Sequence, residues 1–235
     1  RAVLPFSTGV IGQPLPVDKI TNALPEAFTK LAADNWFAAA HAIMTTDTIA
    51  KARSVELSLN GQPITLTGIA KGSGMIRPDM ATLLSYIATD AAISASTLQK
   101  MLDVSMEQSF NSITVDGDTS TNDACVLIAT GLAGNSIIDD IDSSDAQQFI
   151  EALNSLSRFL AQAIVRDGEG ATKFISIDVQ QGADADECRQ VAYTIAHSPL
   201  VKTALFASDP NWGRILAAVG RSGLPSLDLS KIAIY

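Results

Sequence analysis

One threonine has the sequence context of a self-activated nucleophile. Thr82 follows Ala81 at the end of a segment rich in Gly and containing Pro, residues 72–80, and it precedes an apolar run. If the chain cuts itself at the Ala81–Thr82 bond, Thr82 gains a free α-amine. The pKa of such an amine is about 7.7–8.0, so near neutral pH it can take the proton of the neighbouring hydroxyl. Without a base of this kind, a threonine hydroxyl is a weak nucleophile. The sequence therefore favours nucleophilic catalysis by Thr82 after cleavage.

Other catalytic arrangements have little support in the sequence. The two histidines, His41 and His197, both lie on helical patterns, and neither has a Ser or Cys nucleophile motif nearby. A Ser/His/Asp or Cys/His mechanism is therefore weakly supported. No group of residues has the spacing of a zinc site, so we expect no metal. The shortage of other bases strengthens the interpretation of Thr82 as a nucleophile that supplies its own base.

Two polar segments could serve either structure or chemistry. Residues 7–12, with sequence STGVIG, could be a plain turn, or their hydroxyl and backbone N–H groups could stabilise a developing oxyanion. Residues 116–123, with sequence DGDTSTND, superficially resemble a cation loop. They lack the spacing and terminal Glu of a helix–loop–helix calcium site, so a polar loop with Asx turns is the favoured interpretation.

Two further segments join helices to other elements. Residues 166–173 could be a helix C-terminus with a glycine stop, or they could present Glu169, between two glycines, to the amino group of a substrate. Residues 209–216 combine a turn with a helix start. There we favour a structural role for Trp212 and Arg214, which would pack and pair within the fold.

Composition restricts the class of protein. The 235 residues are 47% hydrophobic and 17% charged, which suits a globular core, and the apolar runs are too short to span a bilayer. The net charge of −9 and the absence of a Lys/Arg cluster disfavour nucleic-acid binding. We expect Cys125 and Cys188 to be free buried thiols in a reducing compartment. The chain begins at Arg1, without a methionine, and its last residues, 232–235, have the pattern of the middle of a strand, so we expect both ends to continue in a longer chain.

Helical and strand patterns are mixed along the chain, which predicts an α/β or α+β protein built from packed layers. The Asn60-Gly61 pair predicts a tight hairpin turn that delivers the next strand to the segment before Thr82. Ser144 with Gln147 forms a capping-box pattern. Helices are predicted at residues 17–31, 35–44, 96–110, 144–164 and 184–195. Strands are predicted at residues 55–59, 64–69, 83–88, 124–130 and 173–179.

Together the polar segments resemble the ornithine acetyltransferase (glutamate N-acetyltransferase) family of arginine biosynthesis. The matching segments follow the family's order over nearly the whole chain, at residues 7–12, 44–48, 70–76, 78–84, 116–123, 167–173 and 209–216. The resemblance implies one self-processing catalytic region, residues 1–235, in an N-terminal-nucleophile fold of two β-sheets flanked by helices. Cleavage at Ala81–Thr82 would give an α chain (1–81) and a β chain (82–235) that stay together, in an oligomer of αβ units such as a cytoplasmic heterotetramer.

The same resemblance implies a ping-pong acetyl transfer. Thr82 would take the acetyl group of N-acetylornithine, release ornithine and pass the acetyl group to glutamate. No cofactor is implied, although acetyl-CoA is an alternative donor in some relatives. An Asn and a hydroxyl residue near the family's C-terminus would complete the site beyond this sequence. The residues that match the oxyanion hole are Thr8 and Gly9, and those that match substrate-binding positions are Thr45, Lys71, Thr82 and Glu169.

Two charged side chains fit this chemistry. Lys71 offers a positive charge for a substrate carboxylate, and Glu169 offers a negative charge for a substrate amino group. The expected partners are therefore small molecules, with neither nucleic acid nor membrane. Two alternatives remain: a related self-processing aminopeptidase or amidase, in which water takes the acyl group, and an inactive truncated module. Fold alone does not decide among them.

Overall fold

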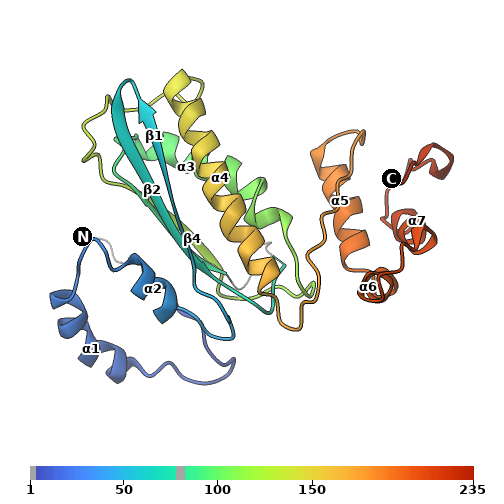
Figure 1. The fold of residues 1–235 in the computed structure, drawn as a ribbon, viewed down its shortest axis with the longest axis horizontal. Helices are drawn as coiled ribbons and strands as arrows, with labels where there is room; N and C mark the ends of the chain where they lie inside the picture. Colours follow the sequence, from blue (N-terminus) through green and yellow to red (C-terminus); the bar gives the residue numbers. More distant parts are fainter. Residues whose placement is uncertain (1–3, 78–82) are drawn as a thin grey trace. The chain divides into compact units, whose positions relative to one another are not determined.

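A computed structural model describes residues 4–77 and 83–235 (Figure 1). The chain divides into two compact units, Arg1–Glu169 and Gly170–Tyr235. The first unit contains α1 (Val17–Thr29), α2 (Trp36–Ala42), β1 (Lys51–Leu59), β2 (Gln62–Lys71), β3 (Leu84–Thr89), α3 (Ala95–Glu107), η1 (Phe110–Ser112), β4 (Ala124–Ala129) and α4 (Ser144–Arg166). The second contains α5 (Ala185–Ala196), α6 (Pro199–Phe206), α7 (Trp212–Gly220) and η2 (Leu229–Lys231).

The strands form one four-stranded sheet in the order β1-β2-β3-β4. The first two pairings are antiparallel and the third is parallel. Asn60 and Gly61 both have positive φ, 49° and 82°, and they join paired Leu59 and Gln62. Positive φ at both central residues is what a two-residue hairpin with the right strand twist needs. The predicted hairpin is therefore confirmed.

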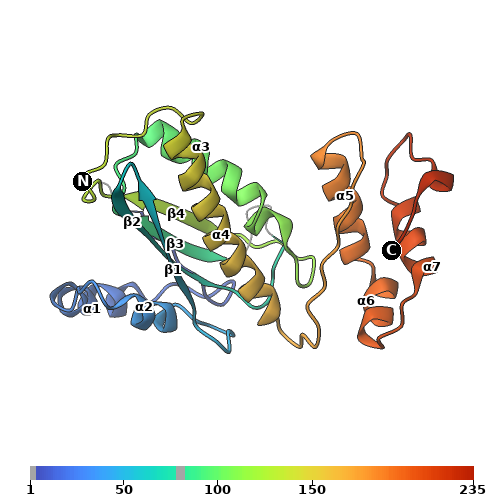
Figure 2. The ribbon, with the colours of Figure 1, turned by 45° about the horizontal axis from the view of Figure 1, so that its top comes forward.

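The two faces of β2 have different roles, because successive side chains of a strand point to opposite faces. Leu66 and Ala70 belong to the core cluster that α4 completes, and Gly68 lets the Leu156 and Leu160 side chains approach closely. Figures 1 and 2 show α4 lying along this face. The other face carries Ile69 and Lys71, and α2 contacts β1 and β2. The Lys71 side is therefore not the face that α4 covers.

A buried ion cluster ties the start of β1 to the end of α4. Lys51 Nζ lies 2.7 Å from Asp47 Oδ1 and 2.6 Å from Asp167 Oδ2, and none of the three side chains is more than 5% exposed. Asp167 also accepts the Thr48 N–H at 3.0 Å. Burial by itself raises the pKa of both carboxyls, but hydrogen bonds and the charge of Lys51 outweigh it and hold each pKa below its usual value.

The second unit is helical, with a small core of its own. That core comprises Val191, Ile195, Val201, Ala218 and Val219. Asp184 caps α5 by accepting the Glu187 N–H at 2.8 Å, as its sequence pattern predicts. The strand predicted at 173–179 is wrong: no strand forms there, because no other described strand lies beside it to share backbone hydrogen bonds.

Most other predicted elements are confirmed, with small shifts in their bounds. Ser143, not Ser144, is the N-cap of α4, since its hydroxyl accepts the Ala146 N–H. The mixed class is confirmed as well, but the described residues form one sheet where the resemblance implied two. Cys125 and Cys188 are free thiols. No helix among the described residues is both long and apolar enough to cross a bilayer.

We predict that Gly68→Ala destabilises the first unit. A Cβ at Gly68 would lie 3.0 Å from both Leu156 Cδ2 and Leu160 Cδ1, so these closely packed leucine side chains would have to shift. Overpacking of this kind costs about 1–3 kcal/mol, measurable by urea unfolding. The control is Gly213→Ala in α7, where the new Cβ meets only Asn211 Oδ1 at 3.6 Å. An unchanged unfolding midpoint for Gly68→Ala would contradict close packing of α4 here.

Removing the buried cation Lys51 should lower the free energy of unfolding far more than removing the exposed cation Lys30. Lys51→Met leaves Asp47 and Asp167 buried together without a counter-charge, and we expect a loss of about 3–5 kcal/mol. Lys30→Met breaks the Lys30–Glu26 pair, also spaced i,i+4 but about 70% exposed, and should cost about 0.5 kcal/mol or less. Equal losses in urea unfolding would show that the cluster does not stabilise the fold.

The same cluster makes the free energy of unfolding depend on pH in the acid range. The folded-state pKa of Asp47 and of Asp167 is lowered below the usual value of 3.8, so their contribution is complete above that value. The contribution is lost as pH falls below 3.8 through the folded-state pKa values. The free energy of unfolding, followed by urea titration through this range, should fall steeply for the native chain. In the Lys51→Met variant, the free energy of unfolding should change less over the same pH range.

Candidate active site

Two of the predicted substrate-binding residues, Lys71 and Thr45, meet the predicted oxyanion-hole residue Thr8 at the end of β2. The Lys71 side chain is 2% exposed, and its Nζ donates to Thr8 Oγ1 and Thr45 Oγ1, each at 3.4 Å. Burial lowers the pKa of Lys71, while the charges of Asp47 and Asp123 oppose that change. The cluster thus combines a cation with two hydroxyls, which are donors suited to a carboxylate or a developing oxyanion.

Asp47 fixes two of these groups through the backbone. Its Oδ2 accepts the Thr45 N–H at 3.1 Å, and its Oδ1 accepts the Gly72 N–H at 2.7 Å. Gly72 directly follows Lys71, so one carboxylate holds the loop that carries Thr45 and the strand end that carries Lys71. The Lys51 ion cluster therefore reaches into the candidate site.

Glu169 lies against the loop that follows Lys71. Its N–H donates to the Ser73 carbonyl at 3.0 Å, and the Ser73 hydroxyl donates to the Asp167 carbonyl at 2.7 Å. A Cβ on Gly74 would lie 2.6 Å from Glu169 Oε1, so a glycine there lets the carboxylate rest on the backbone. Residues 71–74 thus carry a buried cation at one end and an exposed carboxylate beside the other.

The predicted nucleophile, Thr82, and Ala81 before it lie outside the described residues. Their described neighbours are held by the loop at 116–123. Asp116 accepts the N–H groups of Met75 and Ile76, at 2.6 and 3.0 Å. Asp123 Oδ1 accepts the Leu83 N–H. One polar loop therefore holds the chain on both sides of residues 78–82.

The remaining predicted residues are placed as follows. Gly9 follows Thr8 and is exposed, with open space where a Cβ would point. Arg214 has the expected structural role, donating to the Leu200 carbonyl and the Thr203 hydroxyl. The packing role expected for Trp212 is wrong, since this side chain is 65% exposed. Within the described ranges no group of His, Cys, Asp or Glu could hold a metal ion.

Sequence reasoning missed the carboxylates and the lysine that organise the site. Lys51 meets Asp167 across 116 residues of chain, and no local pattern reveals such a pair. Asp47, Asp123 and Asp167 did lie inside segments that carried the family resemblance. Their acidic side chains next to predicted buried strands and helix ends were the available signal.

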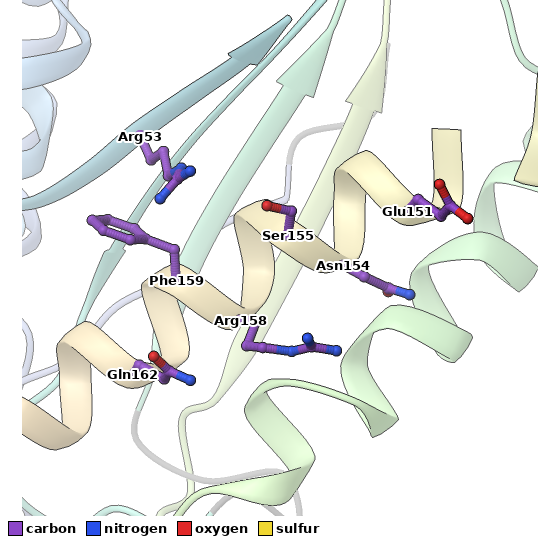
Figure 3. A pocket seen from close by; sticks show the side chains of 7 residues that line it. All are labelled: Arg53, Glu151, Asn154, Ser155, Arg158, Phe159 and Gln162. Carbon is purple, nitrogen blue, oxygen red and sulfur yellow. The ribbon is translucent and has the colours of Figure 1, made fainter. Parts of the chain in front are cut away.

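A separate hollow of about 430 Å³ lies along the outer side of α4 (Figure 3). The Arg53 guanidinium sits 4.6 Å above the Phe159 ring, and Arg158 and Glu151 also line the hollow. No predicted site residue lines it. The hollow is therefore distinct from the Lys71 cluster.

The chain is similar in sequence to known proteins. The chain is 57% identical over 234 residues to the arginine biosynthesis bifunctional protein ArgJ of Pseudomonas syringae, covering 100% of the chain and 58% of that protein. It is 58% identical over 233 residues to the protein of the same name from Methylococcus capsulatus, covering 99% and 57%. The chain thus spans less than three-fifths of the length of these relatives.

A solved structure is similar as well. The crystal structure of the arginine biosynthesis bifunctional protein argJ from Bacillus halodurans matches with a TM-score of 0.56 and 46% identity, over 59% of this chain and 64% of that one. The sequence model of the ArgJ family matches residues 1–235. The chain therefore belongs to the ArgJ family.

Proposed function

We propose that the protein containing this chain transfers an acetyl group from N-acetylornithine to glutamate through an acetylated Thr82. The observation that carries the proposal is the buried Lys71 ammonium between Thr8 and Thr45, next to the loop on which Glu169 rests. Membership of the ArgJ family supports the same reaction. Cleavage at Ala81–Thr82 precedes it, the two chains remain together, and their αβ units assemble as a cytoplasmic heterotetramer.

The transfer has two balanced steps. The Thr82 hydroxyl attacks the acetyl carbonyl of N-acetylornithine while the Thr82 amine takes the hydroxyl proton. That proton passes to the departing ornithine nitrogen, leaving an acetyl ester on Thr82. The α-amine of glutamate then attacks the ester, and Thr82 regains its proton as N-acetylglutamate leaves.

The Lys71–Thr8 contact supports an oxyanion role for Thr8. Because Lys71 Nζ donates to Thr8 Oγ1, the oxygen accepts from a cation and its own proton is available to another acceptor. A hydroxyl polarised in this way is a stronger donor to a developing oxyanion. The Gly9 N–H would be the second donor. Glu169 would hold the side-chain ammonium of N-acetylornithine.

Thr82→Ala should leave the chain uncut and abolish acetyl transfer. Thr82→Ser, which keeps a hydroxyl, should retain part of both. The measurement is the intact mass of the protein expressed with its natural flanking sequence, together with acetyl-group partitioning from N-acetylornithine with and without glutamate. Thr21→Ala is the control, because the exposed Thr21 hydroxyl donates to carbonyls of its own helix, those of Val17 and Asp18. An uncut chain with full activity would exclude Thr82 as nucleophile, and acetate as the main product in both assays would favour a hydrolase.

Glu169→Gln should weaken binding of N-acetylornithine selectively. Loss of one partly exposed charge contact is worth about 1 kcal/mol, so we expect the KM for N-acetylornithine to rise about fivefold. The KM for glutamate should change less, because glutamate lacks a side-chain ammonium. Glu151→Gln, which removes an exposed carboxylate of α4 that lines the separate hollow, is the matched control. Equal changes for both substrates would argue against this role for Glu169.

A further inference from the structure

Gly74 is the point at which the Glu169 side chain lies against the loop after β2. A Cβ built on Gly74 would lie 2.6 Å from Glu169 Oε1, 2.8 Å from its Cδ and 3.2 Å from its Oε2. The whole carboxyl group therefore occupies the space that a side chain at position 74 would need. The φ of Gly74 is not positive, so its backbone conformation does not itself require a glycine. The close carboxylate is the physical reason for the missing side chain.

The backbone around this contact is held on both sides. The Ser73 hydroxyl donates to the Asp167 carbonyl at 2.7 Å, and the Ser73 carbonyl accepts the Glu169 N–H at 3.0 Å. Asp116 Oδ2 accepts the N–H of the residue after Gly74 at 2.6 Å. Because the main chain is fixed in this way, a methyl group on Gly74 would displace the Glu169 side chain and not the loop.

The Glu169 carboxylate is positioned by this packing alone. Glu169 is exposed, and within the described ranges its carboxylate forms no hydrogen bond or ion pair. It is therefore available to an ammonium group, and no partner on the protein would hold it in place once Gly74 carried a side chain. Of the two proposed substrates, only N-acetylornithine has a side-chain ammonium.

We propose that Gly74 determines specificity for an acetyl donor with a side-chain ammonium, an inference that rests on the proposed role of Glu169. The bare backbone at position 74 lets the carboxylate lie where the substrate ammonium meets it. A charge-assisted hydrogen bond weakens when its distance and direction change, so a displaced carboxylate binds the ammonium less well. Gly74 acts through Glu169 and is a positioning residue, so the rate of acetyl transfer from bound substrate should not depend on it.

A methyl group has different consequences at Gly74 and at Gly68. At Gly68 it would meet Leu156 and Leu160, both 0% exposed in the core. At Gly74 it would meet the far end of an exposed side chain, which can turn to another rotamer in water. We therefore expect Gly74→Ala to change substrate preference with little effect on the urea unfolding midpoint.

The test measures KM and kcat for both substrates in Gly74→Ala, Glu169→Gln and the double variant, each expressed with its natural flanking sequence. Gly74→Ala should raise the KM for N-acetylornithine about three- to fivefold, the effect of losing a partly exposed charge contact, and leave kcat and the KM for glutamate near native. The double variant should match Glu169→Gln alone, because effects of residues in contact are not additive. Gly213→Ala, where a Cβ meets Asn211 Oδ1 at 3.6 Å, is the matched control and should be native in all values.

Each contrary outcome has a distinct meaning. A native KM for N-acetylornithine in Gly74→Ala, with a raised KM in Glu169→Gln, would overturn the inference and leave the role of Glu169 intact. Rises that multiply in the double variant would overturn it too. So would a Gly74→Ala chain that fails to fold, since the Glu169 side chain would then not be the part that moves. An unchanged KM in Glu169→Gln would overturn the role of Glu169 and this inference together, whereas absence of acetyl transfer in the native protein would overturn the proposed function itself.

Discussion

The candidate site depends on the burial of Lys51 between Asp47 and Asp167. Two buried carboxylates tolerate each other only with a cation between them, because charge repulsion and desolvation are both severe away from water. The cation is fixed at the start of β1, so it draws together the loop before that strand and the end of α4. From there Asp47 holds the backbone of Thr45 and Gly72, and Glu169 follows Asp167 by two residues. The two ionic contacts of Lys51 thereby place the charged groups expected to bind substrate.

The two buried lysines are held in opposite ways, which explains their different roles. Lys51 lies within 2.7 Å of two carboxylates, so its charge is neutralised inside the fold. Lys71 donates instead to two hydroxyls at 3.4 Å, and burial lowers its pKa. Hydroxyls do not cancel a positive charge. The charges of Asp47 and Asp123 also act on Lys71. Lys71 thus remains the proposed contact for an incoming carboxylate, whereas Lys51 is paired within the fold.

Local chemistry could be predicted from the sequence, and long-range chemistry could not. The hairpin at Asn60-Gly61 and the cap at Asp184 depend on neighbours a few residues away, so residue type and spacing suffice. The strand predicted at 173–179 alternates correctly but has no described partner strand, which no local pattern can supply. The resemblance predicted roles for Thr8, Thr45, Lys71 and Glu169. The contact of Lys51 with Asp167 spans 116 residues, and only the fold reveals it.

The sheet topology explains how a chain cut at Ala81–Thr82 could remain one structure. The bond lies between β2 and β3, and these strands pair antiparallel from Lys71–Leu84 to Leu66–Thr89. On the core side, α4 from the second segment packs against β1 and β2 from the first. Backbone hydrogen bonds and apolar contacts thus join the segments before and after the Ala81–Thr82 bond, and neither depends on that bond. Because Asp116 and Asp123 hold Met75, Ile76 and Leu83 from one loop, the chain on both sides of the bond would stay in place after the cut.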